Sequence, residues 1–217
     1  MYNTSKVVFS PRVRKSPYFN STIKYGATAF SVYNHMYMPV TYDGTIEDYK
    51  KLLDGVQLWD VGVERQVQIK GPDAESLAQF LTPRNIKKCS IGQAMYTPLT
   101  DFKGNLINDP VMLKIDDDCY WFSVSDGDLL LWAQGIAAGY KFEVDVDEPD
   151  VSPLQVQGPN STKLMTKVFG DWINDLGFYK FKEINHEGIP MVIARMGYSK
   201  ELWYELFLQD HSKGDEL

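Results

Sequence analysis

The stretch Gln66-Val-Gln-Ile-Lys-Gly-Pro-Asp73 is the best guide to the fold of this chain, because it joins a strand pattern directly to a helix start. Residues 66–70 alternate in polarity, as a half-buried strand does. Pro72 suits the first helical position, where its missing N–H is not needed, and Asp73 places negative charge near the positive end of the helix dipole. The sequence therefore predicts a strand over 66–70 followed at once by a helix.

The same arrangement occurs a second time at Leu154-Gln-Val-Gln-Gly-Pro-Asn160. Gly71 and Gly158 stand at matching positions in the two copies, and a helical pattern of apolar residues follows each. Gly-Pro is a common way to begin a helix, so one occurrence alone would carry little weight. Because strand, turn and helix match together, we predict two α+β units related by an internal repeat.

Further elements are expected between and around the two copies. Apolar residues recur at helical spacing from Ile46 to Val56, which predicts an amphipathic helix ahead of Trp59. Another helix is expected after Ser125 or Asp126, either of which is a suitable N-cap. The further expected strands cover residues 112–115, 119–124, 178–184, 190–195 and 203–208.

The bulk composition is that of an ordinary globular protein. The chain has 217 residues, of which 44% are hydrophobic and 24% are charged, enough for one large or two small domains. A net charge of −7 argues against a nucleic-acid partner, which would need a basic face. No apolar run reaches the ~18 residues of a membrane span, so we expect no membrane association. Two cysteines without a C-x-x-C pair, and no visible signal peptide, fit a reduced cytoplasmic setting.

Several common catalytic motifs are absent from the sequence. There is no G-x-S-x-G, no phosphate-binding loop and no G-x-G-x-x-G, which excludes the usual hydrolase, nucleotide and dinucleotide patterns. The three histidines are isolated, and none lies at metal-ligand spacing from another, so we expect no metal site.

The stretch from Tyr96 to Asp109 carries the clearest chemical signal. It predicts a strand, a turn at Lys103-Gly104-Asn105 and a second strand that ends in a carboxylate. Pro110 restricts the backbone of Asp109 to extended conformations. Tyr96 and Ser125 are polar residues that can face Asp109 across adjacent strands. The alternative remains open that Asp109 is an ordinary turn or cap residue.

A second pair of candidate residues is Tyr198 and Glu205. Gly197 allows a sharp turn after a strand, and the two side chains then stand on either side of the connection. From spacing alone they either line a site or belong to the surface and the core.

Taken together, these motifs resemble the tetrahydrofolate-dependent aminomethyltransferases, the T-proteins of the glycine cleavage system and their relatives. The similarity runs from about Arg12 to the last residue. The opening Arg-Val-Arg-Lys-Ser-Pro-Tyr and the segment 32–36 are more similar to the branch that contains dimethylsulfoniopropionate demethylase. The motifs that carry the resemblance are Leu58-Trp-Asp-Val61, residues 66–74, Leu81-Thr-Pro-Arg84, Asn108-Asp-Pro-Val111 and Gln157-Gly-Pro159.

The resemblance implies an α+β fold of two ferredoxin-like units with antiparallel sheets. The first unit would comprise residues 1–52 and 153–217, and the second residues 53–152. The family also has a C-terminal barrel domain and an arginine in the folate site. Both would lie beyond Leu217, so we expect this chain to lack them.

The resemblance also implies roles for individual residues. Asp109 matches the catalytic acidic residue, and Tyr96 and Tyr198 match tyrosines that line the folate pocket. Glu205 matches the glutamate that hydrogen-bonds the pterin ring. Ser125 stands where T-proteins usually have an asparagine, so that contact differs here.

The implied function is transfer of a one-carbon unit to tetrahydrofolate by an aminomethyltransferase or methyltransferase. The segment 196–203, Met-Gly-Tyr-Ser-Lys-Glu-Leu-Trp, matches neither the T-protein nor the demethylase pattern, so the donor stays open. A small-molecule methyl or aminomethyl donor and a lipoyl-carrier protein are the candidate partners. Tyr33, Tyr37 and Trp203 are candidates to hold a positively charged donor against an aromatic face. Two alternatives are demethylation of dimethylsulfoniopropionate and a folate-binding regulatory protein without catalysis.

Overall fold

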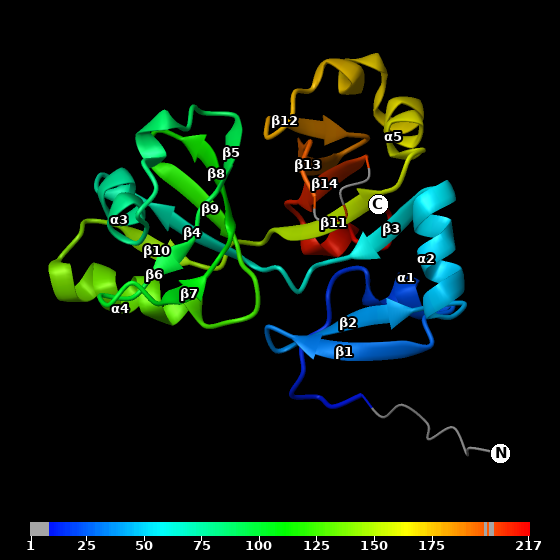
Figure 1. Cartoon of the computed structure of the whole chain (residues 1–217), viewed down its shortest axis with the longest axis horizontal. Helices are drawn as coiled ribbons and strands as arrows, with labels where there is room; N and C mark the ends of the chain where they lie inside the picture. Colours follow the sequence, from blue (N-terminus) through cyan, green and yellow to red (C-terminus); the bar gives the residue numbers. More distant parts are fainter. Residues whose placement is uncertain (1–8, 198, 200–201) are drawn as a thin grey trace.

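The computed structural model describes residues 9–197, 199 and 202–217. Two α+β units lie side by side, and two segments of chain cross between them (Figure 1). A short N-terminal region packs beneath the first unit. All strand pairs within the two main sheets are antiparallel. The predicted α+β class with antiparallel sheets is therefore confirmed.

The second unit contains a five-stranded sheet in the order β10-β4-β9-β8-β5. Helices α3 and α4 cover one face of this sheet, and a small hairpin, β6–β7, precedes β8. The bounds are β4 (Gln66–Lys70), α3 (Ala74–Phe80), β5 (Gln93–Tyr96), β6 (Leu99–Thr100), β7 (Leu106–Asn108), β8 (Val111–Asp116), β9 (Cys119–Ser123), α4 (Leu129–Tyr140) and β10 (Asp145–Asp147), with a 3₁₀ turn at Ile86–Lys88.

The first unit contains a five-stranded sheet in the order β12-β13-β14-β11-β3, and the N-terminal region adds a helix and a hairpin. The bounds in this unit are α2 (Thr45–Asp54), β3 (Gln57–Asp60), β11 (Ser152–Gln157), α5 (Ser161–Phe169), β12 (Phe181–His186), β13 (Ile189–Ala194) and β14 (Trp203–Leu208). The N-terminal elements are α1 (Phe19–Lys24), β1 (Ala29–Tyr33) and β2 (Met36–Thr41), and 3₁₀ turns lie at Asp171–Asp175 and His211–Lys213.

The two sheets have the same topology, which confirms the internal repeat. The order β10-β4-β9-β8 in one sheet corresponds to β3-β11-β14-β13 in the other, and β5 and β12 are the matching edge strands. The helix and edge strand that end the second unit, α4 and β10, correspond to α2 and β3, which precede β11 in the chain. The repeat is therefore a circular permutation, and this is why the chain crosses twice between the units.

The two glycines of the repeat, Gly71 and Gly158, each allow a close backbone contact that a side chain would block. Gly71 has φ 137° and Gly158 has φ 116°, both in the region that favours glycine. A Cβ atom at Gly71 would lie 2.8 Å from the Glu143 carbonyl oxygen, and one at Gly158 would lie 2.6 Å from the Gly55 carbonyl oxygen. In both copies the glycine lets the strand-to-helix turn approach the segment that follows the other helix.

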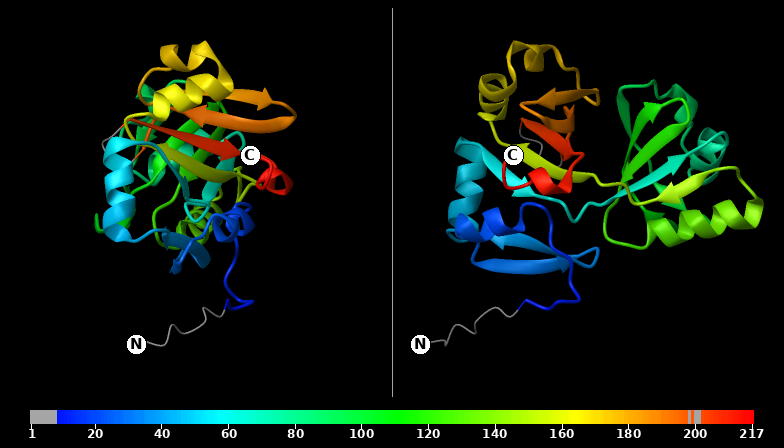
Figure 2. Two further views of the ribbon diagram at one scale, coloured as in Figure 1. Left: turned by 90° about the vertical axis from the view of Figure 1, so that its right-hand side faces the viewer. Right: turned by 180° about the vertical axis from the view of Figure 1, so that it is seen from behind.

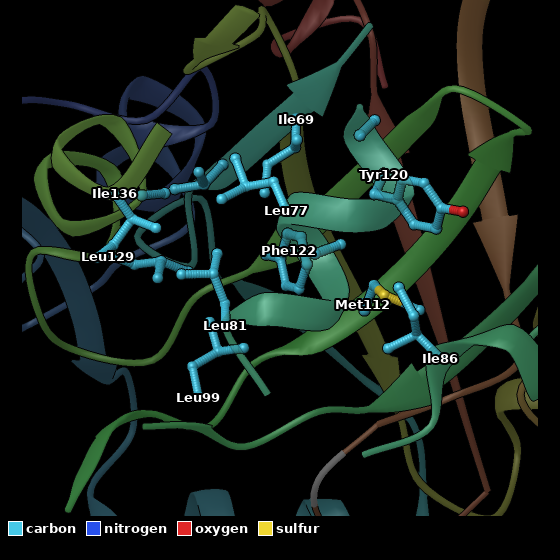
Figure 3. Packing of buried hydrophobic residues seen from close by; sticks show 14 of the residues in the cluster. Ile69, Leu77, Leu81, Ile86, Leu99, Met112, Tyr120, Phe122, Leu129 and Ile136 are labelled. Carbon is cyan, nitrogen blue, oxygen red and sulfur yellow. The ribbon is translucent and has the colours of Figure 1, made fainter. Parts of the chain in front are cut away.

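Each unit has its own apolar core, and a third cluster joins the units. In the second unit, Ile69, Leu77 and Phe122 are among the fully buried side chains between the sheet and helices α3 and α4 (Figure 3). The third cluster contains residues of both sheets, such as Trp121 of β9 and Phe207 of β14. The faces of the two sheets that carry no helix therefore pack against each other.

The edge strands of the two sheets also touch. Gln93 and Lys180 form an isolated bridge, and the Ala94 N–H donates to the Tyr179 carbonyl oxygen at 2.8 Å. This contact corrects one expectation, because the strand predicted over 178–184 begins only at Phe181. Tyr179 has φ 56°, so the chain turns there and cannot continue a strand.

The two crossing segments are tied together by ion pairs. Arg65 lies on the crossing from β3 to β4, and Glu148 on the crossing from β10 to β11. The Arg65 guanidinium lies 2.8 Å from the Glu148 carboxylate, which also pairs with Arg14 of the N-terminal region. Three segments that are distant in sequence are thereby held at the junction of the units.

The N-terminal hairpin β1–β2 lies beneath the first unit, and its turn is directed at the second unit (Figures 1 and 2). Among the residues that the structure describes, no helix combines the length and hydropathy that a membrane span requires.

Candidate active site

Asp109 lies between β7 and β8, at the side of the second unit that faces the junction. Its Oδ1 atom accepts a hydrogen bond from the Ser125 hydroxyl at 2.7 Å, and its Oδ2 atom accepts one from the Tyr96 hydroxyl at 3.2 Å. The structure thus brings together three of the residues singled out from the sequence. With both oxygens bound by neutral donors, the carboxylate is held in one orientation.

The local sequence explains how these three residues meet. Tyr96 pairs with Val111 across β5 and β8, and Val111 pairs with Ser123 across β8 and β9. Asp109 lies two residues before Val111, and Ser125 lies two residues after Ser123. Because β8 and β9 are antiparallel, both residues are at the same end of the sheet, next to Tyr96.

The buried side chain of Asn108 holds Ser125 in place by hydrogen bonds to its backbone. The Asn108 side-chain oxygen accepts from the Ser125 N–H at 3.1 Å and lies 3.1 Å from the Ser125 hydroxyl, whose single proton goes to the closer Asp109 oxygen. The Asn108 amide donates to the Ser125 carbonyl at 2.9 Å. The helix after this segment begins at Leu129 with Asp128 as its N-cap residue, and Asp128 makes no side-chain cap. The expectation that Ser125 or Asp126 caps the helix was therefore wrong, because the Ser125 side chain is used to bind Asp109.

Glu205 is the second carboxyl group of the site, on β14 of the first unit. It is 4% exposed, and its Oε1 atom accepts from the Gln155 amide at 2.7 Å across β11 and β14. Gln155 in turn accepts from Gln157 at 2.9 Å. Glu205 Oε2 is buried and has no hydrogen-bond partner among the described residues. A buried oxygen left in this way is a ready acceptor for a ligand N–H group.

Burial, assisted by a second carboxyl group, changes the protonation of Glu205. Burial and then the charge of Glu64 raise the pKa of Glu205 well above its usual value. Burial likewise raises the pKa of Glu64 to about 7. Glu64 lies on the crossing from β3 to β4, so the junction of the two units holds a pair of interacting acids. Raised carboxyl pKa values in a cluster are a feature of functional sites.

The two carboxyl regions are connected by tyrosines. Burial raises the pKa of Tyr33, and a hydrogen bond with the Asp126 backbone opposes this. The carboxylates of Glu64, Asp126 and Asp109 raise the pKa further, but more weakly. Burial and then the Glu205 carboxylate raise the pKa of Tyr179, while the Arg84 guanidinium opposes this.

Burial, then Asp109, and last Tyr179 raise the pKa of Tyr96. Tyr179 therefore interacts electrostatically both with Tyr96, which binds Asp109, and with Glu205. The sequence analysis missed Tyr179 and Glu64, because neither follows a recognisable motif.

The remaining predicted residues have mixed outcomes. Tyr198 lies outside the described residues. Tyr37, one of the aromatic candidates for a donor site, instead packs in the N-terminal cluster, 5.0 Å from the ring of Phe9. Trp203 is half-buried and lies 6.2 Å from the ring of Phe178. The carboxylates of Glu64 and Asp109 act electrostatically on the third aromatic candidate, Tyr33.

Other sites in the molecule are chemically different. A cavity of about 630 Å³ lies between α2, β2 and β3, lined by side chains such as Tyr42, Tyr49 and Trp59. It contains neither Asp109 nor Glu205. Within residues 9–197, 199 and 202–217, no group of three or more His, Cys, Asp or Glu side chains is arranged to hold a metal ion.

Comparison with known proteins identifies the family. The model of the GCVT N-terminal domain matches residues 18–216 of this chain. This chain belongs to the GCVT family.

Curated members of the GCVT family share a substantial part of the sequence. The dimethylsulfoniopropionate demethylase DmdA of Ruegeria pomeroyi is 41% identical over 208 residues, which are 96% of this chain and 57% of the relative. An aminomethyltransferase of Halothermothrix orenii is 29% identical over 199 residues, 90% of this chain and 55% of the relative. The chain thus spans a little over half the length of these relatives. The expected resemblance to the demethylase branch is confirmed.

A solved structure shows the same fold. The glycine cleavage system aminomethyltransferase T of Bartonella henselae superposes with a TM-score of 0.82 at 20% identity, covering 94% of this chain and 55% of that one. The two-unit architecture is therefore that of GCVT proteins.

Proposed function

We propose that the protein is a tetrahydrofolate-dependent methyl- or aminomethyltransferase in which Asp109 is the catalytic acidic residue. One observation carries this proposal: Ser125 and Tyr96 hold Asp109, and Tyr179 links Tyr96 electrostatically to Glu205, whose buried Oε2 has no partner among the described residues. Membership of the GCVT family supports it, as do relatives named as aminomethyltransferases and as a demethylase.

The residues of the junction fit a folate. A pterin ring presents N–H donors along one edge, and the buried Glu205 Oε2 is an acceptor of matching chemistry. Tyr96 is 43% exposed and offers an aromatic face beside Asp109. We assign folate binding to Tyr96, Ser125 and Glu205, and also to Tyr198 on the strength of its family motif.

Asp109 acts on the transfer step through its fixed charge. Positive charge develops on the donor carbon or on the acceptor nitrogens as the one-carbon unit moves. A carboxylate already oriented by two hydroxyl groups stabilises this charge without reorganising. The same carboxylate is placed to accept a proton. The rest of the rate gain comes from aligning a weakly nucleophilic nitrogen with the carbon that it receives.

The charge of the junction favours a cationic donor. Asp109 and Asp126 act electrostatically on Tyr33, and Glu64 adds to this when it is ionised. This combination suits a sulfonium or ammonium compound, which gains from both the ring face and the carboxylates. Together with the 41% identity to a demethylase, this favours dimethylsulfoniopropionate over a lipoyl-bound aminomethyl group as the donor.

The experiment that tests the function combines binding and turnover on the intact protein. Titration calorimetry with tetrahydrofolate is carried out on wild type, on Asp109→Asn and on Asp117→Asn, a control in the exposed β8–β9 turn. We expect all three to bind. With dimethylsulfoniopropionate added, Asp109→Asn should lose about a hundredfold or more in kcat, while Asp117→Asn keeps wild-type turnover.

The other candidate functions predict different results. Tight binding of tetrahydrofolate without turnover of a methyl or aminomethyl donor would favour a regulatory folate-binding protein. Formation of methylenetetrahydrofolate from a lipoyl-bound substrate would favour aminomethyl transfer. A wild-type protein that binds no tetrahydrofolate would contradict the proposal.

A further inference from the structure

We infer that Asn34 is a positioning residue for Asp109 and acts on it through Ser125. Asn34 is in the turn of the β1–β2 hairpin, far from Asp109 in sequence. Turn residues are usually exposed, but Asn34 is 3% exposed and sits against the loop that carries Ser125. This inference rests on the proposed catalytic role of Asp109.

Asn34 makes four hydrogen bonds across the junction. Its backbone N–H donates to Asp126 Oδ1 at 2.9 Å, and its side-chain oxygen accepts from the Gly127 N–H at 2.9 Å. Its amide nitrogen donates to the Ser125 carbonyl at 3.2 Å and to the Val63 carbonyl at 3.0 Å. Every polar group of the side chain is therefore satisfied, as a buried amide requires.

These bonds hold the segment that orients the Asp109 carboxylate. The Ser125 carbonyl is shared by two amide donors, Asn34 and Asn108. The hydroxyl of the same serine donates to Asp109 Oδ1 at 2.7 Å. Gly127, the other partner of Asn34, has φ 146°, a conformation that favours glycine. Removing the Asn34 side chain leaves Asn108 as the side chain that hydrogen-bonds the Ser125 backbone among the described residues.

Asn34 also links Asp109 to the second acid region. Val63, whose carbonyl accepts from Asn34, directly precedes Glu64 on the crossing from β3 to β4. One side chain therefore sets the N-terminal hairpin, the crossing segment and the Ser125 loop relative to one another. Catalytic geometry is sensitive to shifts of about 1 Å. Loss of the Asn34 hydrogen bonds should therefore lower kcat by more than the accompanying loss in the free energy of unfolding would explain.

The test uses two substitutions at turn residues with similar backbone geometry. Asn34→Gly removes the side chain and keeps the left-handed conformation, which has φ 48° at this position. Glu187→Gly is the matched control, because Glu187 has φ 53°, is exposed, and occupies the turn between β12 and β13. Both variants are made in the intact protein, and tetrahydrofolate and dimethylsulfoniopropionate are the probes.

Two measurements report on the link. We expect Asn34→Gly to lower kcat by about tenfold to a hundredfold, with wild-type values in Glu187→Gly. Amide hydrogen exchange supplies a readout that does not depend on activity. The Ser125 N–H donates to Asn108 and does not touch Asn34, so its exchange should accelerate in Asn34→Gly only if the loop is held through Asn34.

A third variant tests the donor function of the amide. Asn34→Asp keeps the acceptor for Gly127 and replaces the two N–H donors by an oxygen that faces the carbonyls of Val63 and Ser125. A protonated carboxyl can donate to one of these carbonyls, and an ionised one repels both. The activity of Asn34→Asp relative to wild type should therefore rise as the pH falls, whereas a merely structural defect would give a constant ratio.

The outcomes separate this inference from the proposed function. Unchanged Ser125 exchange and unchanged kcat in Asn34→Gly would overturn the inference. Wild-type protein that neither binds tetrahydrofolate nor consumes the donor would overturn the proposed function. In that case the amide hydrogen exchange rate of Ser125 decides by itself whether Asn34 positions the loop.

Discussion

At the residue scale, the surroundings of each carboxyl group assign its chemistry. Asp109 has two neutral hydroxyl donors, which orient its carboxylate. Glu205 has one amide donor, is buried and lies within electrostatic reach of Glu64, so its pKa is raised, and a ligand N–H group would favour the ionised form that accepts at Oε2. Solvation and hydrogen bonding differ between Asp109 and Glu205, and the proposed roles differ accordingly: catalysis for Asp109 and ligand binding for Glu205.

The hydrogen bond from Ser125 to Asp109 gives a first prediction. Ser125→Ala removes the 2.7 Å contact and leaves the backbone bonds of Asn108 in place. We expect kcat to fall about tenfold, because one carboxylate oxygen loses its orienting donor, which is worth about 1–1.5 kcal/mol. Steady-state kinetics and unfolding in urea check it. A loss of stability that accounts for the loss of activity would contradict a specific role of the hydroxyl.

The pair Glu64 and Glu205 gives a second prediction, on pH. The folded pKa of Glu64 is raised from 4.5 to about 7, so the folded state holds more protons than the unfolded state between these values. The contribution of Glu64 to stability is fully present below pH 4.5 and is lost as the pH rises to about 7. Glu64→Gln removes this loss and also lowers the pKa of Glu205, since the neighbouring charge is gone.

Urea unfolding at several pH values measures the effect. Glu64→Gln should match wild type near pH 4.5 and exceed it above pH 7 by on the order of 1–3 kcal/mol. The Glu187→Gln variant, at an exposed turn position, serves as the control for the chemical change itself. A parallel offset of Glu64→Gln from wild type would show that its carboxyl group is not the source of the pH dependence.

At the element scale, the joint between strand and helix is the feature that both units share. In each unit it places a glycine at positive φ against the end of a second helix. The edge strand that comes next in the chain, β5 or β12, then reaches the other unit through the bridge between Gln93 and Lys180. The joint therefore sets how each helix lies on its sheet. The sheets in turn position Asp109, which precedes β8, and Glu205, which lies within β14.

This joint gives a third prediction. In Gly158→Ala the new Cβ would lie 2.6 Å from the Gly55 carbonyl oxygen, and backbone atoms cannot move aside cheaply. We expect a loss of about 3 kcal/mol or more of stability. Gly104→Ala is the matched control, because Gly104 also has positive φ but a Cβ there would meet no neighbouring group within 4 Å. It should cost about 1 kcal/mol, for backbone strain alone. Equal costs in chemical unfolding would contradict the steric argument.

At the scale of the whole molecule, a circularly permuted repeat places the site between two units. The second unit is inserted into the first, and the buried residues of its core all lie within 67–137. The first unit draws β3 from before the insertion and β11 from after it. Sheet membership places the two crossings at residues 61–65 and 148–151, and we propose these segments as the working boundaries.

The insertion gives a fourth prediction, about independent folding. A fragment of residues 61–150 contains a complete sheet, both covering helices and their core, so it should fold cooperatively with reduced stability. The reduction is expected because Trp121 and its neighbours lose their contacts with the other sheet.

A fragment of residues 151–217 should stay unfolded, because it lacks β3 and α2. Circular dichroism with thermal melting distinguishes the two fragments. Cooperative melting of the second fragment, or none in the first, would contradict this division of the chain.

Much of this protein was determined by local sequence alone. The repeated strand–Gly-Pro–helix pattern predicted two α+β units, and the run from Tyr96 to Asp109 placed a carboxylate beside a tyrosine, because strand pairing acts over short distances. The strand boundary at 178 and the cap of α4 were wrong. Tyr179 turns against the other unit, and the Ser125 side chain binds Asp109, so contacts distant in sequence overrode local preference.

Only the tertiary structure decided how the acids are combined. Glu64, Tyr179 and Asn34 belong to no motif, and their meeting depends on two crossings that bring segments far apart in sequence within hydrogen-bonding or electrostatic reach. A pKa or a buried amide bond depends on what surrounds it in space. The sequence determines which residues carry a carboxyl group, but the pKa and the proposed role of each group depend on how the two units pack, because both are set by the surrounding atoms.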